Sequence, residues 1–285
     1  MLRHFYLDTN AFRYFGEAFA QQILPDDLRG RMLISPLSAF EVFAQLAREN
    51  GGDDVLQQIR AIRNWSNPKR CVLLPWPDAW LYQVWFQKEK PDDSFTKRME
   101  AAFNWCLEAN TPDSLAELKK VAVDHTKLMD DFKRQKAEQF KAMVDDMKQQ
   151  KLKAIDTTVV WFVSIANSVG ADPKSRPLAE IVSAFSAHHE FEQAKLQTAL
   201  ANQEYNPLSR KNQNDIIDTE QLVYLSDESL CMITADSGFK RKVTKSKQAD
   251  QIITVPATDL MVAKKAEAAL RECVLFARNQ PHRSN

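Results

Sequence analysis

Short apolar runs that alternate with helix-like segments constrain the fold of this chain most strongly. In the N-terminal part, strands are predicted at Phe5–Leu7, Arg31–Ile34 and Cys71–Leu74. The intervening segments space their apolar residues as helices do, over residues 11–22, 38–48 and 55–65. A strand that returns to the next strand through a helix favours a parallel sheet with right-handed crossovers. An α/β fold is therefore expected.

The same alternation returns near the C-terminus. Strands are predicted at Ser229–Thr234 and Gln251–Val255, and helices over 214–224 and 259–277. In the middle of the chain strand signals disappear, and amphipathic, highly charged segments such as 114–153 predict helices. The apolar run 159–163 is expected to pack against the core, as a helix or as a strand. The chain thus divides into the first half of an α/β core, a mostly helical insertion and the second half of the core, over residues 1–75, 76–205 and 206–285.

The composition indicates a globular protein and argues against several classes of nucleotide-binding enzyme. A chain of 285 residues with 44% hydrophobic content can bury a sizeable core. Lys and Arg together number 38, as do Asp and Glu, so no net charge points to a nucleic acid or a membrane. None of the six glycines forms a GxGxxG or Walker loop, which disfavours kinases, P-loop ATPases and dehydrogenases with a glycine-rich nucleotide loop.

The cysteines and the N-terminus favour a reducing compartment. The four cysteines form no CxxC pair, so buried thiols are expected at Cys71, Cys106, Cys231 and Cys273. The N-terminus carries no signal-peptide pattern, and no apolar run approaches the roughly 20 residues of a membrane span. A soluble cytoplasmic protein is expected. The histidines at 125, 188 and 189 show no metal-ligand spacing and are expected to be surface polar groups.

Acidic residues stand where a parallel sheet would bring them together. Asp8 and Asp236 each follow a predicted strand, so adjacent strands would place both at the carboxyl edge of the sheet. Asp215 and Asp218 share one face of a predicted helix, which is unfavourable unless a cation lies nearby. Glu41 stands within an apolar stretch and is expected to face a compensating group. Each acid also has a simpler explanation, as a turn residue, a helix cap or a surface residue.

The side-chain types in this set indicate a particular chemistry. Carboxylates without Cys or His among them form a hard-oxygen site suited to Mg²⁺ or Mn²⁺. Such sites serve phosphoryl transfer to water, because the ion lowers the pKa of a water molecule and stabilises charge on the leaving oxygen. The sequence contains no GxSxG elbow and no convincing Cys/His pairing, so covalent catalysis has little support.

Four short motifs follow one another along the chain: YLDTNAF, SPLSAFEV, NDIID and ITADSGF. In their order they resemble the motifs of the PIN (PilT N-terminus) domain family of metal-dependent ribonucleases. The resemblance covers residues 1–75 and 206–262 and does not extend to the helical middle of the chain. It implies a three-layer α/β/α fold around a central parallel sheet, interrupted here by a large helical insertion.

The resemblance also implies an activity and a set of site residues. The activity would be a divalent-metal-dependent nuclease, an endoribonuclease acting on RNA, with Mg²⁺ or Mn²⁺ as cofactor. Asn10 and Thr234 would position carboxylates or a water molecule. Many members of the family are toxins of toxin–antitoxin pairs, which implies a regulatory antitoxin-like protein. The metal-binding and catalytic acids would be Asp8, Glu41, Asp218 and Asp236, with Asp215 as an alternative to Asp218 or as an additional acid.

Basic and aromatic residues supply two further hypotheses about a nucleic acid. Basic residues flank the acidic motifs, and phosphate contacts are predicted for Arg210, Lys211, Lys240, Arg241 and Lys242, with a solvated loop as an equal alternative. The aromatic residues between Trp65 and Trp105 can stack on single-stranded bases. The helical spacing of Trp80 with Val84 favours core packing instead.

Two other functions compete with the nuclease. One is a catalytically inactive PIN-fold protein that binds RNA or acts as a scaffold. The other is a haloacid-dehalogenase-like phosphatase, which resembles this chain in an Asp after the first strand. That family carries a second acid two positions later, where this chain has Asn10, so the phosphatase is disfavoured.

Overall fold

The computed structural model describes residues 3–48, 52–65, 73–87, 94–149, 157–168, 170–202 and 204–279. It is mostly helical and is built around a small sheet of four strands in the order β2-β1-β3-β4. All three strand pairs are parallel, which confirms a parallel sheet with helical connections. The strands are β1 (His4–Leu7), β2 (Met32–Ile34), β3 (Leu230–Thr234) and β4 (Ile252–Thr254).

The predicted strand Cys71–Leu74 is described only in part. Leu73 makes an isolated parallel bridge to Ile34, whereas Cys71 and Val72 lie outside the described residues. Pro75 and Pro77 follow directly in the sequence. Because proline lacks the N–H that a ladder needs, pairing cannot continue past this point.

The register of the strands fixes what lies at the carboxyl edge of the sheet. Leu7 of β1 pairs with Ile34 on one side and with Ile233 on the other. The residues that follow, Asp8 and Thr234, therefore emerge side by side. Open α/β sheets place their sites at this edge.

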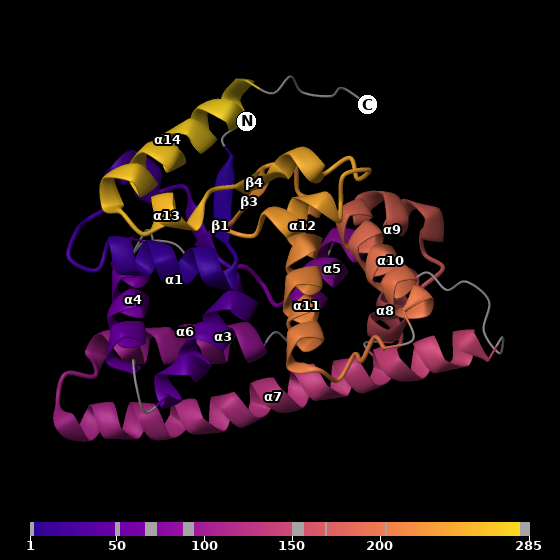
Figure 1. The fold of residues 1–285 in the computed structure, drawn as a ribbon, viewed down its shortest axis with the longest axis horizontal. Helices are drawn as coiled ribbons and strands as arrows, with labels where there is room; N and C mark the ends of the chain where they lie inside the picture. The colour runs from indigo at the N-terminus through magenta and orange to yellow at the C-terminus, as the bar shows by residue number, and fades with distance from the viewer. Residues whose placement is uncertain are drawn as a thin grey trace.

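Helices cover both faces of the sheet, since successive side chains of a strand point to opposite faces. Phe5 and Leu7 belong to one core cluster, and Tyr6 belongs to the other. Figure 1 shows the two groups of helices on either side of the strands. The first cluster includes residues of α1 (Thr9–Ala18), α2 (Asp26–Arg29), α3 (Pro36–Ala44), α4 (Gly52–Trp65), α6 (Ser94–Glu108), α13 (Ala257–Leu260) and α14 (Ala263–Asn279). The second includes residues of α5 (Pro77–Phe86), α8 (Thr157–Ser168), α9 (Leu178–Ala184), α10 (Ser186–Ala201), η2 (Leu222–Ser226) and α12 (Ser237–Arg241).

The middle of the chain is helical and is not a separate body. Among its described residues between 76 and 205 there is no strand, and the apolar run 159–163 forms part of helix α8. Met99 and Phe103 join the first core cluster, whereas Phe162 and Phe191 join the second. The insertion boundaries at 75 and 205 stay a prediction, but these helices complete the same cores as the sheet.

Helix α7 (Pro112–Lys148) is 37 residues long and runs along one side of the molecule beneath both helical groups (Figure 1). A capping box between Thr111 and Ser114 fixes its start. Its buried residues recur every four or seven positions and form one stripe. The stripe consists of Leu118, Ala122, Met129, Lys133, Ala137 and Val144.

Two expectations about single residue types have different outcomes. The described cysteines, Cys106, Cys231 and Cys273, are buried and free, as expected. The prediction for His188 is wrong, because this side chain is only 3% exposed and its ring centroid lies 4.9 Å from that of Trp161.

In the described part of the chain, no helix is both long and apolar enough to cross a membrane.

Candidate functional site

Asp8 caps helix α1 and is also buried at the carboxyl edge of the sheet. Its Oδ1 accepts a hydrogen bond from the Ala11 N–H, and its Oδ2 accepts one from the Thr234 hydroxyl, both at 2.6 Å. Burial raises the pKa of Asp8 to about 6; the two hydrogen bonds oppose this rise, and the charges of Asp236 and Glu41 add to it. The capping role is therefore present, and each oxygen retains a second lone pair for another ligand.

Glu41 lies on α3 and is held from two sides. Its Oε2 accepts a hydrogen bond from the Thr9 hydroxyl at 2.6 Å, and its Oε1 lies 2.6 Å from Lys133 Nζ. Lys133 is thus the compensating group that the apolar surroundings of Glu41 predict. Ser38, one turn earlier, fixes α3 to the sheet edge, because its hydroxyl lies 3.0 Å from the carbonyl of Leu7.

The two acids of helix α11 (Arg210–Gln221) line different clefts. Asp218 is half-buried and lines the same cleft as Asp8 and Glu41. Burial, followed by the charge of Asp8, raises the pKa of Asp218 well above its usual range. Asp215 lines a different, smaller cleft of about 430 Å³ and pairs with Lys242 at 3.3 Å. The geometry therefore favours Asp218 over Asp215 as the third acid.

Asp236 lies exposed just beyond β3, where it caps the short helix α12. Its Oδ1 accepts a hydrogen bond from the Gly238 N–H at 2.6 Å, and its own N–H donates to the Thr234 hydroxyl oxygen at 3.0 Å. Thr234, fully buried, thus connects Asp236 to Asp8. Asp236 acts on the pKa of Asp8 through its charge but does not line the cleft described next.

A cleft of about 900 Å³ opens between the sheet edge and α7. Its wall brings together Asp8, Glu41 and Asp218 from three separate segments, and Asn10 lies exposed beside Asp8. In the described part of the chain, no three His, Cys, Asp or Glu side chains are grouped closely enough to hold a metal ion. The donors fit a hard cation chemically, because they are carboxylate oxygens. Their negative charges repel one another, and a bound cation would neutralise this repulsion. Binding an ion would require these side chains to move closer together.

The predicted phosphate contacts have mixed positions. Lys242 pairs with Asp215 and lies 4.3 Å above the ring centroid of Phe191. Lys240 and Arg241 lie in the last turn of α12. The side chains of Arg210 and Lys211 lie outside the described part of the structure, although both residues belong to α11.

The cleft also contains cations that the sequence analysis does not single out. Arg13, Arg48 and Lys133 line it together with the acids. Lys133 has a recognisable sequence signal, since it falls in phase with the apolar stripe of α7 where a hydrophobic residue is expected. Arg13 has a weaker signal: it follows Asp8 by five positions in the same helix-forming stretch.

Comparisons of the chain with models of protein families, with curated proteins and with solved structures find no match. Any functional conclusion therefore depends on the residues of the chain itself and on the geometry of this cleft.

Proposed function

We propose that this protein is a PIN-like nuclease that hydrolyses RNA phosphodiester bonds with Mg²⁺ or Mn²⁺. The observation that carries the proposal is the convergence of Asp8, Glu41 and Asp218 on one polar cleft. The raised pKa values of Asp8 and Asp218 reflect burial together with repulsion between like charges. Acids perturbed in this way collect at functional sites. The small parallel sheet with helices on both faces is compatible with the fold that the motifs imply.

The acids near the sheet edge and two arginines of the cleft have separate roles in this proposal. When bound, the ion would supply a Lewis acid that activates water and stabilises charge on the leaving oxygen. Asp8, Glu41 and Asp218 would hold the ion, and Thr234 would orient Asp8. The guanidinium groups of Arg13 and Arg48, also in the cleft wall, would bind neighbouring phosphates of the RNA. Asp236 would be the outermost acid of the set.

A nuclease assay tests the proposal directly. Purified protein is incubated with mixed RNA and DNA in the presence of Mn²⁺ or EDTA. We expect RNA cleavage with Mn²⁺ and none with EDTA. We expect Asp8→Asn and Asp218→Asn to abolish cleavage, and Asp236→Asn to weaken it, because Asp236 is connected to Asp8 through Thr234. Asp215→Asn is the matched control, because Asp215 lies on the same helix but pairs with Lys242 outside the cleft. Cleavage that survives both chelation and Asp8→Asn would contradict the proposal.

A catalytically inactive RNA-binding or scaffold protein is the second candidate. It is favoured by the ion pair between Glu41 and Lys133 and by the lack of a closely grouped metal-ligand set among the described residues. Calorimetric titration with Mn²⁺ separates the two functions. A nuclease should show binding heat that is lost in Asp8→Asn, whereas a scaffold should show no such difference between the wild type and the variant. The phosphatase hypothesis is tested by phosphoaspartate trapping at Asp8.

The implied toxin role extends the proposal to a regulatory protein. If the nuclease is a toxin, its expression should arrest the growth of host cells, and the Asp8→Asn variant should not. Relief of that arrest by a co-expressed neighbouring gene product would identify the antitoxin-like partner.

A further inference from the structure

A row of basic residues follows the outermost acid of the site, on the connection between β3 and β4. Residues 237–249 contain five cations and no Asp or Glu, although Lys and Arg only equal Asp and Glu in number over the whole chain. In a protein without net charge, such a local excess is where an anionic partner would be attracted. We call this row the basic strip; it consists of Lys240, Arg241, Lys242, Lys245 and Lys247.

The backbone that carries the basic strip is held by buried side chains between and after the cations. Val243 is fully buried in the second core cluster, and Ser246 and Gln248 are also buried. The side chain of Gln248 accepts a hydrogen bond from the Ala187 N–H at 2.8 Å and donates one to the Ala184 carbonyl at 2.6 Å. The segment is therefore a fixed part of the fold, and ordering it on binding would cost little entropy.

The anchors lay the cations in a row along α10 and α9. In chain order, Lys242, the Lys245 backbone and Lys247 contact residues of decreasing number, which are Phe191, Glu190 and Ser183. The contact of Lys245 uses its backbone N–H, so its ammonium group stays exposed. The strip thus presents separate charges along a line, as a polynucleotide backbone does with its phosphates.

Most cations of the strip are not neutralised by the protein. Lys242 pairs with Asp215 at 3.3 Å. The cations that form no ion pair with any of the described residues are Lys240, Arg241, Lys245 and Lys247. Of these, the last three are exposed. Exposed cations with a fixed backbone bind phosphate oxygens, because each contact releases counterions from the nucleic acid.

The strip begins next to the candidate site. A Cβ atom built at Gly238 would lie 2.9 Å from Asp236 Oδ1 and 3.6 Å from Arg241 Nη2, so this guanidinium stands beside the outermost acid. Asp236 is connected through Thr234 to Asp8, which lines the cleft. An RNA strand that leaves the cleft past Asp236 would meet the strip.

We propose that the basic strip is an exosite that binds the backbone of an RNA substrate outside the cleft and supplies affinity without taking part in the chemistry. The identity of the ligand as RNA rests on the proposed function. Phosphate contacts carry no sequence information, so the strip should bind different homopolymers alike.

RNA binding in EDTA tests the inference in the absence of cleavage. Fluorescence anisotropy with labelled oligouridine compares the wild type with the triple variant Arg241→Gln/Lys245→Gln/Lys247→Gln. We expect the affinity of the variant to fall roughly tenfold or more, and the slope of log K against log[salt] to be shallower by about 2. Equal affinity and equal slope in the two proteins would overturn the inference.

A second triple variant separates the strip from a general effect of charge. Lys119→Gln/Lys127→Gln/Lys265→Gln removes the same number of positive charges at exposed positions on α7 and α14. It should bind oligouridine like the wild type, and a loss equal to that of the strip variant would overturn the inference. Vesicles of anionic phospholipid test the other partner of a basic surface: a strip variant that loses vesicle binding but keeps its affinity for RNA would also overturn it.

The nuclease assay distinguishes a failure of the exosite from a failure of the proposed function. For an active wild type, the strip variant should raise KM and leave kcat unchanged, and an unchanged KM would overturn the exosite alone. A wild-type protein that binds oligouridine through the strip in EDTA but cleaves no RNA with Mn²⁺ would contradict the nuclease and support the exosite.

Discussion

Asp8 both stabilises and destabilises the folded protein, through its hydrogen bond and through its charge. Its bond to the Ala11 N–H caps α1, an interaction that contributes about 1 kcal/mol in typical helices. Its negative charge, by contrast, is buried near Glu41 and Asp236. Above a pH of about 6 the folded protein holds this carboxyl ionised at a cost, which a bound cation would relieve.

Asp8→Asn should therefore stabilise the protein without metal and make it insensitive to metal. We expect the free energy of unfolding in EDTA at pH 7.5 to rise by about 1–2 kcal/mol, because Asn keeps a capping oxygen and removes the buried charge. Mn²⁺ should raise the melting temperature of the wild type and leave that of the variant unchanged. Asp53→Asn, at an acid paired with Lys119 away from the cleft, should respond to Mn²⁺ like the wild type. A variant that still responds to Mn²⁺ would exclude Asp8 as a ligand.

The burial of neutral His188 should make the protein less stable as the pH falls, whereas the buried carboxyl of Asp8 should make it less stable as the pH rises. Burial lowers the pKa of its ring from 6.5 to about 4; Glu192 opposes this, and the charges of Lys195, Lys136 and His189 add to it. Between pH 6.5 and about 4, the unfolded chain binds a proton on His188 that the folded protein does not bind. The stability that depends on the neutral ring is therefore fully present above pH 6.5 and is lost as the pH falls. The full effect is at most about 3 kcal/mol.

Urea unfolding of His188→Gln at pH 7.5 and at pH 4.5 measures this contribution. The variant should lose less stability than the wild type between the two values of pH, by roughly 2 kcal/mol. His189→Gln, a half-buried neighbour on the same helix, is the control and should behave like the wild type. Equal losses in His188→Gln and the wild type would show that His188 does not titrate as its burial requires.

At the scale of elements, the close packing of α1 against α4 depends on Gly16, which has no side chain. A Cβ atom at Gly16 would lie 2.8 Å from Gln58 Cβ and 2.9 Å from its Cα. Neither atom can move without moving the backbone of α4. Because α4 packs in the same core as the sheet, a shift there would be transmitted to the strands.

Gly16→Ala should destabilise the protein by about 1–3 kcal/mol through overpacking. Gly30→Ala is a suitable control, since the nearest atom to its added Cβ is the Asp26 carbonyl oxygen at 3.5 Å, an ordinary contact. Chemical denaturation of both variants checks the difference. Equal stability of the two variants would show that α1 and α4 separate without cost.

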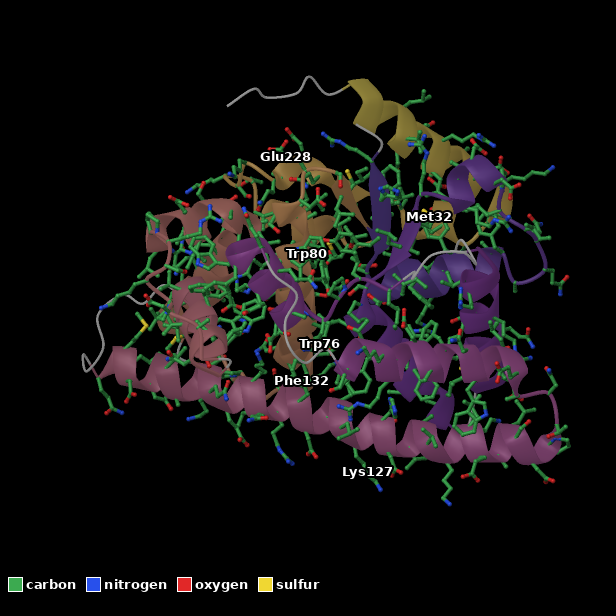
Figure 2. All side chains as sticks on the ribbon, turned by 180° about the vertical axis from the view of Figure 1, so that it is seen from behind. Met32, Trp76, Trp80, Lys127, Phe132 and Glu228 are labelled. Atoms are coloured by element: carbon green, nitrogen blue, oxygen red, sulfur yellow. The ribbon has the colours of Figure 1, made fainter. Side chains whose placement is uncertain are left out.

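At the scale of the whole molecule, the described helices between residues 76 and 205 contribute to both cores that cover the sheet. They supply Phe103 to one core cluster and Phe162, Phe185 and Phe191 to the other. Figure 2 shows Trp76 and Phe132 side by side, with ring centroids 5.9 Å apart, where α7 meets the chain just after Pro75. Removing these side chains would expose large apolar areas on both faces of the sheet.

A variant in which a short Gly/Ser linker replaces residues 76–205 should therefore not fold cooperatively. We expect no near-ultraviolet circular dichroism signal and no sharp thermal transition. A variant that does fold would show that the sheet and its N- and C-terminal helices form an independent domain, as in a simple insertion.

The sequence by itself determined the four strands of the sheet, their parallel arrangement and the chemical nature of the acids, because apolar periodicity and short motifs are local properties of the chain. It was sufficient to place Asp8 and Asp236 at the same edge of the sheet, since each follows one of two adjacent parallel strands. It could not choose between Asp215 and Asp218, which share a helix face in projection. Only the packing of α11 against the sheet edge decided that Asp218 faces the cleft.

Tertiary structure alone decided the contribution of the helical middle of the chain. Lys133 is 92 positions from Glu41 in sequence, and no local pattern predicts which acid a lysine on a long helix will meet. The burial of His188 is not predictable from its local sequence for the same reason, since it depends on Trp161 and on helices that converge only in the folded chain. Burial and ion pairing are set by contacts between distant segments, and the sequence pattern of a single segment does not contain them.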